Sequence, residues 1–404
     1  MSANQTSSAI TSSGPFVQEG PKLVGTGNLG SGQQGIVAVS ADGNTAVVGG
    51  ANDDAGTGAI WIFTRTAELW TQQGSKLVGT DCIGATGLGT SVAISADGNT
   101  VIAGGSGDNT MVGAAWIFTR TDGVWSQQGN KLVGSNSIGY SMQGAAVAIS
   151  ADGNTAAIGG NGDSYAVGAT WIFALSGSTW SQLGEKLVGT GFESTANQGS
   201  SLAMSADGKT LIVGSVLSVQ GDAPVWVFVK DTAWQQQGSY LTASGSINNA
   251  YGQNTSVSVS ADGNTFVLGE NQDDGQIGAA WIFSRSAGAW SQQGGKLVGT
   301  GAVGNAAQGC SVSISGDGNT AIVGGNTDNG NTGAVWVYRR TAGSWAQSGA
   351  KLVGTGATGN ADQGNSVAIS ADGQTILSGG FGDDNLVGAT WVFAEAQPTS
   401  RPER

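Results

Sequence analysis

Two series of aspartates recur along this chain at a spacing of 55 residues. A carboxylate that returns in every repeat has the chemistry of a base, a metal ligand or a turn former. The first series stands in Ser-Ala-Asp-Gly-Asn-Thr and its variants and comprises Asp42, Asp97, Asp152, Asp207, Asp262, Asp317 and Asp372. The second series follows eleven residues later and comprises Asp53, Asp108, Asp163, Asp273, Asp328 and Asp383.

The first series has the sequence of a tight turn. Ala-Asp-Gly-Asn separates two short apolar segments, and Asp-Gly between such segments is a strong signal for a two-residue hairpin. Calcium needs several oxygen ligands, and this loop supplies one carboxylate. We therefore interpret these aspartates as turn formers.

The second series is the better candidate for a site. Six carboxylates around a ring could bind a cation, a sugar or a basic partner surface, so we take all six as candidate ligand-binding residues. The structural alternative is that each accepts backbone N–H bonds within its own glycine-rich loop. We assign no metal site and no cofactor. Weak calcium binding by these loops is an alternative, because several loops carry a second oxygen-bearing side chain: Asp54, Asn109, Asp274, Asn329 and Asp384.

Composition excludes several functions. The net charge of -13 with only 15 lysines and arginines argues against nucleic-acid binding. The sequence contains no run of about 18 apolar residues, which insertion across a membrane would need. The chain has no histidine, the commonest general base, and its Gly-x-Gly-x-x-Gly matches lead into strands and not helices. Cys82 and Cys310 occupy different repeat positions, which favours two free thiols. These observations predict that the chain is not an enzyme.

Each repeat predicts four antiparallel strands. In the second repeat these are residues 91–95, 100–105, 114–121 and a final strand through "VWSQQGNKLVGS". Small residues dominate the first strand and tryptophans the last two, a taper that suits blades packed around an axis. The sequence therefore predicts an all-β, seven-bladed β-propeller.

The chain termini indicate how the ring closes. The last repeat stops after its third strand, and the missing fourth strand matches "FVQEGPKLVGTG" near the N-terminus. We expect this N-terminal strand to complete the C-terminal blade. The predicted organisation is a flexible tail over 1–15, one propeller over 16–395 and a flexible tail over 396–404, in a monomer.

The repeat "GTSVAISADGNTVIAGG…VGAAWIFTR…WSQQGNKLVG" resembles the FG-GAP repeat of integrin α-subunit heads and bacterial surface proteins. The resemblance spans residues 16–393 in seven units, although Gln-Gly or Leu-Gly stands where the family has Phe-Gly. It implies a propeller that binds other proteins. The calcium-binding members have a longer acidic loop between strands one and two than this chain has.

The fourth repeat departs most from the others. Its loop places Val216, Leu217 and Val219 where other repeats are polar, and Ser218 interrupts the aspartate series. Tyr240 stands where the other repeats carry a lysine, which we interpret as a guard on an exposed edge strand. Loss of that lysine beside an apolar loop predicts a partner-binding patch of these four apolar residues, with sequence drift as the alternative.

Taken together, these observations predict a non-enzymatic binding or adhesion scaffold that takes a protein or glycan ligand on its loop face. One alternative is a carbohydrate-binding propeller with repeated weak sites. A propeller hydrolase or lyase is the least favoured alternative. The polar composition and the family resemblance favour an extracellular or surface-displayed location.

Overall fold

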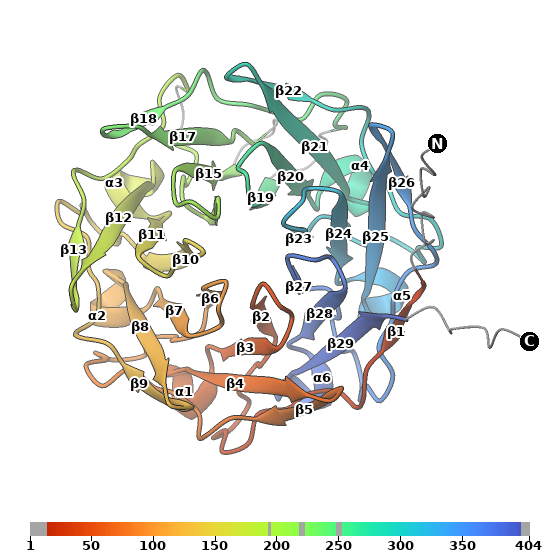
Figure 1. Ribbon diagram of the computed structural model, residues 1–404, viewed down its shortest axis with the longest axis horizontal. Helices are drawn as coiled ribbons and strands as arrows, with labels where there is room; N and C mark the ends of the chain where they lie inside the picture. The colour runs from red at the N-terminus through yellow and green to blue at the C-terminus, as the bar shows by residue number, and fades with distance from the viewer. Residues whose placement is uncertain (1–13, 193–194, 218–222, 248–252, 397–404) are drawn as a thin grey trace, which may run out of the picture.

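The computed structural model describes residues 14–192, 195–217, 223–247 and 253–396. Seven antiparallel sheets stand around a central axis, as Figure 1 shows. The predicted all-β, seven-bladed β-propeller is confirmed.

The first two strands of each blade lie nearest the axis. The innermost strands are β2 (Ile36–Val39), β6 (Ser91–Ile94), β10 (Gln143–Ile149), β14 (Ser201–Met204), β19 (Gln253–Val259), β23 (Ser311–Ile314) and β27 (Ser366–Ile369). The second strands are β3 (Thr45–Gly50), β7 (Thr100–Gly105), β11 (Thr155–Gly160), β15 (Thr210–Gly214), β20 (Thr265–Glu270), β24 (Thr320–Gly325) and β28 (Thr375–Gly380). The innermost strands line an axial cavity of about 280 Å³, mainly with valine, alanine and isoleucine residues.

The outer two strands carry the tryptophans. The third strands are β4 (Ala59–Thr66), β8 (Ala114–Thr121), β12 (Ala169–Ser176), β17 (Trp226–Lys230), β21 (Ala279–Ser286), β25 (Ala334–Thr341) and β29 (Ala389–Glu395). The outermost strands are β5 (Leu69–Gln72), β9 (Val124–Gln127), β13 (Thr179–Gln182), β18 (Trp234–Gln236), β22 (Ala289–Gln292), β26 (Ser344–Gln347) and β1 (Phe16–Gln18). We number the blades 1 to 7 from β2–β5 onward, and we call the contact between two neighbouring blades a seam, so that seam 7/1 joins blades 7 and 1.

The ring closes as predicted. β1 pairs with β29 in the order β1-β29-β28-β27, so the N-terminal strand is the outermost strand of blade 7. The backbone N–H of Ala396 donates to the carbonyl of Pro15 at 2.9 Å. Of the two predicted tails, only Gly14, Pro15 and Ala396 are among the described residues.

The core lies between neighbouring blades. The tryptophan of every third strand is fully buried, and its indole N–H donates to the loop that precedes its blade, as Trp61 does to the carbonyl of Thr26 at 2.8 Å. Glycines of the "KLVG" segments lie against these rings: a Cβ on Gly79 would collide with the indole of Trp116. Glycine holds this place beside six of the tryptophans, and Ala243 holds it beside Trp281.

The "KLVG" segments correct one expectation. The outermost strand ends at the glutamine before them, and the leucine of each "KLVG" segment forms a separate bridge to the third strand, as in Leu77 with Ile60. The lysine is thereby drawn toward the loop between the second and third strands. It does not lie on a free sheet edge, so our interpretation of these lysines as edge guards was wrong.

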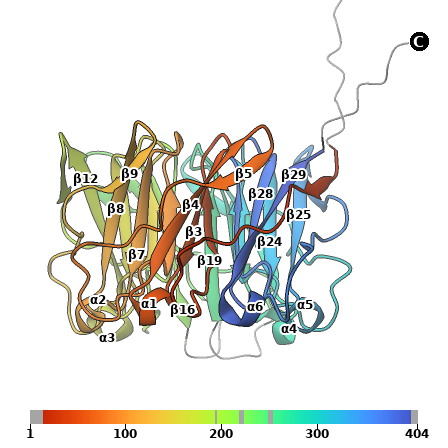
Figure 2. The ribbon, with the colours of Figure 1, turned by 90° about the horizontal axis from the view of Figure 1, so that it is seen from below.

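The loops lie on two opposite faces of the propeller. Six of the second-to-third-strand loops form short turns, which we label α1–α6, on one face, where Figure 2 shows them together. They are α1 (Asp53–Gly56), α2 (Asp108–Met111), α3 (Asp163–Ala166), α4 (Asp273–Gln276), α5 (Asp328–Asn331) and α6 (Asp383–Leu386). The two central residues of each turn have left-handed backbone angles, as Asp54 and Ala55 do. The Ala-Asp-Gly-Asn hairpins and the third-to-fourth-strand turns lie on the other face, which we call the hairpin face. None of the helices among the described residues is long and apolar enough to cross a membrane.

Blade 4 differs from the others at its second-to-third-strand loop. There the two residues of β16 (Val216–Leu217) pair with β19 and add a fifth strand to the sheet of blade 5. The part of the blade 4 loop that the sequence marked as apolar therefore contributes a strand to its neighbour.

Candidate functional site

The hairpin aspartates act within their own turns. Asp42 Oδ1 accepts the hydroxyl of Ser40 at 2.5 Å and the backbone N–H of Asn44 at 3.0 Å, and Oδ2 accepts the Asn44 amide at 3.0 Å. Burial works to raise the pKa of Asp42, but these hydrogen bonds outweigh it and hold the pKa below its usual range. The pKa is lowered in the same way in four other hairpins, at Asp97, Asp152, Asp262 and Asp317. The interpretation as turn formers is confirmed.

The six aspartates of the second series are buried at the starts of α1–α6. Each carboxylate forms an ion pair with the "KLVG" lysine of its own blade; in blade 3 the distance from Asp163 Oδ2 to Lys186 Nζ is 2.5 Å. The other oxygen, Oδ1, accepts a backbone N–H from the loop that enters the blade, as from Ile138 at 2.8 Å. The six pairs are Asp53–Lys76, Asp108–Lys131, Asp163–Lys186, Asp273–Lys296, Asp328–Lys351 and Asp383–Lys22.

These contacts use both oxygens of each carboxylate, and the carboxylates have 0 or 1% of their surface exposed. Each aspartate therefore joins three segments: its own helical turn, the outer segment of its blade and the incoming loop. Ligand binding by the six aspartates stays a prediction. Among the described residues, no group of three or more aspartates, glutamates or cysteines is arranged to hold a metal ion.

The structure describes the residues proposed as a partner patch in blade 4 only in part. Tyr240 is partly buried and contacts Phe192 and Trp226, with ring centroids 5.6 and 6.3 Å apart. Val216 lies in β16, where its backbone pairs with β19, and Leu217 follows it in that strand. Val219 lies outside the described residues. Partner binding by these residues stays a prediction.

On the hairpin face, a repeated polar contact connects neighbouring blades. Arg120 of blade 2 donates to Gln73 Oε1 and to the Thr45 hydroxyl, both of blade 1, at 3.0 and 3.3 Å. Trp125 donates to the same glutamine oxygen at 2.8 Å. Seams 4/5 and 5/6 repeat the arginine–glutamine and tryptophan–glutamine contacts, through Arg285, Trp290 and Gln237 and through Arg340, Trp345 and Gln293.

Seam 7/1 keeps the arginine but replaces the neutral partner with an acid. Glu19 occupies the glutamine position and accepts Arg65 Nη1 at 2.9 Å, while Arg65 Nη2 donates to the Thr375 hydroxyl at 3.1 Å. The Glu19 side chain is 10% exposed, and its Oε1 atom has no hydrogen-bond partner among the described residues. A buried carboxylate oxygen left unpaired is costly, so this atom calls for an explanation.

A second acid enters the same seam from the turn between β4 and β5. Glu68 has a φ of +65°, a conformation that strongly favours glycine, and Gly123, Gly288 and Gly343 hold this place in blades 2, 5 and 6. The side chain of Glu68 is exposed. Glu68 therefore places an acidic side chain where those three blades have none.

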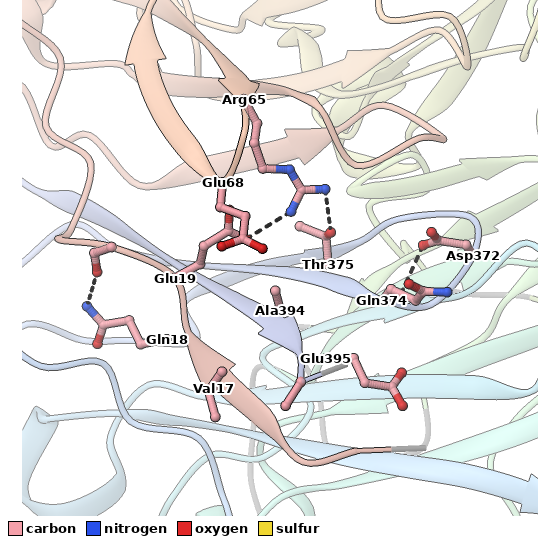
Figure 3. Close-up of a pocket in the computed structure, with 12 residues that line it drawn as sticks. Val17, Gln18, Glu19, Arg65, Glu68, Asp372, Gln374, Thr375, Ala394 and Glu395 are labelled. Carbon is pink, nitrogen blue, oxygen red and sulfur yellow. Dashed lines mark hydrogen bonds and ion pairs between the residues drawn. The ribbon is translucent and has the colours of Figure 1, made fainter. Parts of the chain in front are cut away.

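These departures converge on one pocket of about 480 Å³. Its polar lining includes Glu19, Arg65, Glu68, Asp372 and Glu395. Figure 3 shows Glu19 and Glu68 on the side of Arg65 and Glu395 directed away from them. Glu395 pairs with Arg339 of blade 6 at 2.9 Å. It stands where blades 1, 2, 5 and 6 carry the arginine of the seam contact: Arg65, Arg120, Arg285 and Arg340.

The seam pocket was missed from the sequence. Glu19 and Glu68 belong to segments that meet only when the ring closes, so the sequence alone does not bring the two carboxylates together. A signal was present nonetheless: with the repeats aligned, "QQG" becomes "QEG" at Glu19, and glycine becomes Glu68 in the adjoining blade. Acidic departures from two aligned positions indicate a site better than a residue shared by every repeat.

Both cysteines are free thiols, as predicted. Burial raises the pKa of Cys310 to about 12 and also raises the pKa of Cys82. Neither cysteine has the lowered pKa of a reactive nucleophile.

No protein-family model matches this chain, and no curated protein matches it. Among solved structures, 544 chains match, so the fold is widely shared. One of them is the periplasmic gluconolactonase PpgL of Pseudomonas aeruginosa, at 16% sequence identity and a TM-score of 0.51, over 80% of this chain and 86% of that chain. The likeness supports the propeller fold.

This comparison corrects two expectations. The FG-GAP resemblance is not confirmed, because no family model supports it and the matched propeller is a gluconolactonase. The expectations of a non-enzymatic scaffold and of no enzymatic activity were wrong, since the matched propeller is an enzyme.

Proposed function

We propose that this protein is a propeller hydrolase that opens a small, uncharged, polyhydroxylated cyclic ester in the pocket of seam 7/1. The observation that carries the proposal is the buried Glu19 carboxylate, with Oε1 unpartnered among the described residues and Oε2 bonded to Arg65. The likeness to a gluconolactonase propeller supports the substrate class.

Ester hydrolysis needs a base for water and a group that stabilises negative charge on the carbonyl oxygen. In this proposal Glu19 Oε1 removes a proton from water as the water oxygen attacks the acyl carbon. Each terminal nitrogen of Arg65 carries two N–H bonds and donates one to the protein, so by donor count a second is left on each for the developing oxyanion. The tetrahedral intermediate then breaks its ring C–O bond, and Glu19 returns the proton to the leaving alkoxide.

The remaining pocket groups suit a substrate rich in hydroxyls. Glu68 and Asp372 supply carboxylate oxygens that accept hydrogen bonds from hydroxyl groups. The lining carries four carboxylates, at Glu19, Glu68, Asp372 and Glu395, against the one cation Arg65. This excess of negative charge favours an uncharged ester as substrate. It repels the carboxylate product, which therefore leaves the pocket readily.

The test is hydrolysis of glucono-δ-lactone by the full chain, followed as acid release and corrected for the rate without protein. We expect a rate proportional to protein concentration, and a loss of about 100-fold or more in kcat for Glu19→Gln, the range typical of a general base. Glutamine already holds this position in seams 1/2, 4/5 and 5/6, so the variant retains the arginine contact and is expected to fold.

The matched control is Asp122→Asn, which removes an exposed carboxylate from the corresponding turn of blade 2. It should leave the rate unchanged. A wild-type rate equal to the blank, or a folded Glu19→Gln variant with wild-type kcat, would overturn the proposal. We also propose a location outside the cytoplasm, in keeping with the periplasmic location of the matched gluconolactonase.

A further inference from the structure

Lys209 and Lys230 stand apart from the other lysines. The sequence has eight lysines, and six of them form the Lys–Asp pairs described above. For Lys209 and Lys230 the described residues include no ion pair. The two are neighbours in blade 4, where the backbone N–H of Lys230 donates to the carbonyl of Lys209 at 2.8 Å. Asp207, which accepts the backbone N–H of Lys209 at 3.0 Å, and Asp231 are their acidic neighbours in the chain.

Beside these lysines, seam 3/4 lacks the tryptophan–glutamine hydrogen bond that seams 1/2, 2/3, 4/5 and 5/6 have. Leu183 occupies the position of Gln73 in seam 1/2, and Lys230 occupies the position of Arg120. Trp234, whose counterparts in seams 1/2, 2/3, 4/5 and 5/6 donate to that glutamine, has a buried indole N–H without a hydrogen-bond partner among the described residues, as Trp70 also has. The substitutions in seam 3/4 leave a leucine, a lysine and an unused donor where four other seams have this hydrogen bond.

These residues line a cavity of about 380 Å³, a size typical of small-ligand sites. Leu183, Leu187, Ala233 and Trp234 give it apolar walls, and Lys230 supplies the charge. The cavity is also lined by Lys186, which is paired with Asp163, and by Glu185.

The Glu185 carboxylate is at the surface, and its Oε2 atom accepts the Asn136 amide at 2.9 Å. Seam 6/7 provides an internal comparison. Its cavity has Ser348 in place of Leu183, and its lysine, Lys351, is paired with Asp328. Lys351 corresponds to Lys186, and the position of Lys230 is taken in blade 7 by Glu395, so seam 6/7 has neither the leucine nor the second lysine of seam 3/4.

We propose that the cavity of seam 3/4 binds a small amphiphilic anion, a monocarboxylate with an aromatic or aliphatic body. The body packs against Leu183, Leu187 and Trp234, and the carboxylate pairs with Lys230, with Lys209 adding to the positive potential. Apolar walls with few polar groups are the usual composition of a small-ligand site. The site is separate from seam 7/1 and does not rest on the proposed hydrolase activity.

The test uses the full chain with benzoate and octanoate as probes, measured by calorimetry and by saturation-transfer NMR. Acetate keeps the charge without the body, and benzyl alcohol keeps the body without the charge. We expect the two amphiphilic anions to bind at least 10-fold more tightly than acetate or benzyl alcohol. Lys230→Gln should weaken their binding about 10-fold, because it removes the ion pair.

Leu183→Gln is the second variant. It introduces the glutamine found in seams 1/2, 2/3, 4/5 and 5/6, so it should fold, bond the Trp234 indole and reduce binding at least 10-fold. Gln128→Leu is the matched control, because it places a leucine in seam 2/3, where Leu175 stands at the lysine position. The control should bind like wild type. No binding of either anion, or equal binding in the wild type and both variants, would overturn the proposal.

Discussion

Single residues that depart from the repeat carry most of the functional information in this chain. The repeated aspartates are the most conspicuous carboxylates in the sequence, and their contacts are within turns and between segments of the fold. Glu19 and Glu68 each occur once, in positions where at least three other blades have glutamine or glycine, and both line one pocket. The Lys–Asp pair supports six blades in the same way, whereas a site at one seam needs residues that differ from the repeat.

Glu68 gives a test in which stability and activity change in opposite directions. Its φ of +65° costs a side-chain-bearing residue about 1 kcal/mol, which glycine avoids at the expense of a more flexible unfolded chain. We expect Glu68→Gly to be neutral or to stabilise the fold by up to about 0.5 kcal/mol, and to lower kcat/KM for lactone hydrolysis about 10-fold. Thermal unfolding and the lactone assay on the same preparations check both effects.

The reverse substitution, Gly123→Glu, is the control in blade 2, where φ is +79°. It should destabilise the fold by about 1 kcal/mol and leave the hydrolysis rate unchanged. A Glu68→Gly variant with wild-type kcat/KM would show that the strained glutamate has no part in the reaction.

At the scale of elements, the Lys–Asp pair joins the parts of each blade that the hydrogen bonds of the sheet leave unconnected. The aspartate at the start of α3 binds Lys186 from the outer segment and the backbone of Ile138 from the incoming loop. Blade 4 lacks both partners, since Ser218 and Tyr240 replace them. There Tyr240 packs on Trp226, and the lysines of three other blades lie about 6 Å from the corresponding tryptophan.

Removing one partner of the pair in blade 3 should be more harmful than removing both. Asp163→Asn leaves a largely buried lysine without its counter-charge, so we expect a loss of about 3 kcal/mol in the free energy of unfolding. The double variant Asp163→Ser/Lys186→Tyr reproduces the sequence of blade 4 and should lose less than the sum of its single changes. Denaturant unfolding of the four proteins in a double-mutant cycle measures the coupling. Strictly additive losses would mean that the ion pair does not connect these segments.

At the scale of the whole molecule, the fold could be predicted from the sequence and the pocket could not. The 55-residue period, the Asp-Gly turns and the displaced fourth strand are local patterns, and they determined the number of blades and the closure of the ring. The pocket depends on Glu19 and Thr375 meeting across that closure, although 356 positions separate them in the sequence. The Lys–Asp pairs were missed for a related reason, because their 23-residue spacing has no regular relation to strand geometry.

Ring closure and the proposed active site share the same N-terminal segment. β1 supplies the last strand of blade 7, Gln18 accepts the backbone N–H of Thr355 at 2.7 Å, and Lys22 pairs with Asp383. Glu19 lies within this segment and lines the pocket. Opening the ring at this seam should therefore abolish the site and weaken the fold together, whereas opening it at another seam should weaken closure alone.

Circular permutation separates these effects. The Ala396–Pro15 hydrogen bond places the two ends of the propeller side by side, so a short glycine-serine linker can join residues 396 and 14. New termini between Gly129 and Asn130, after the outermost strand of blade 2, leave seam 7/1 covalently closed. We expect this permutant to fold with a lower melting temperature and to keep at least half of the lactone hydrolysis rate.

By contrast, deleting residues 1–22 from the natural chain should remove both β1 and Glu19 and reduce hydrolysis to the blank. Deleting residues 1–13 alone serves as the control and should change neither property. If the deletion of residues 1–22 keeps its activity, the active site lies outside seam 7/1; if the permutant folds but is inactive, the pocket needs more than the closed seam.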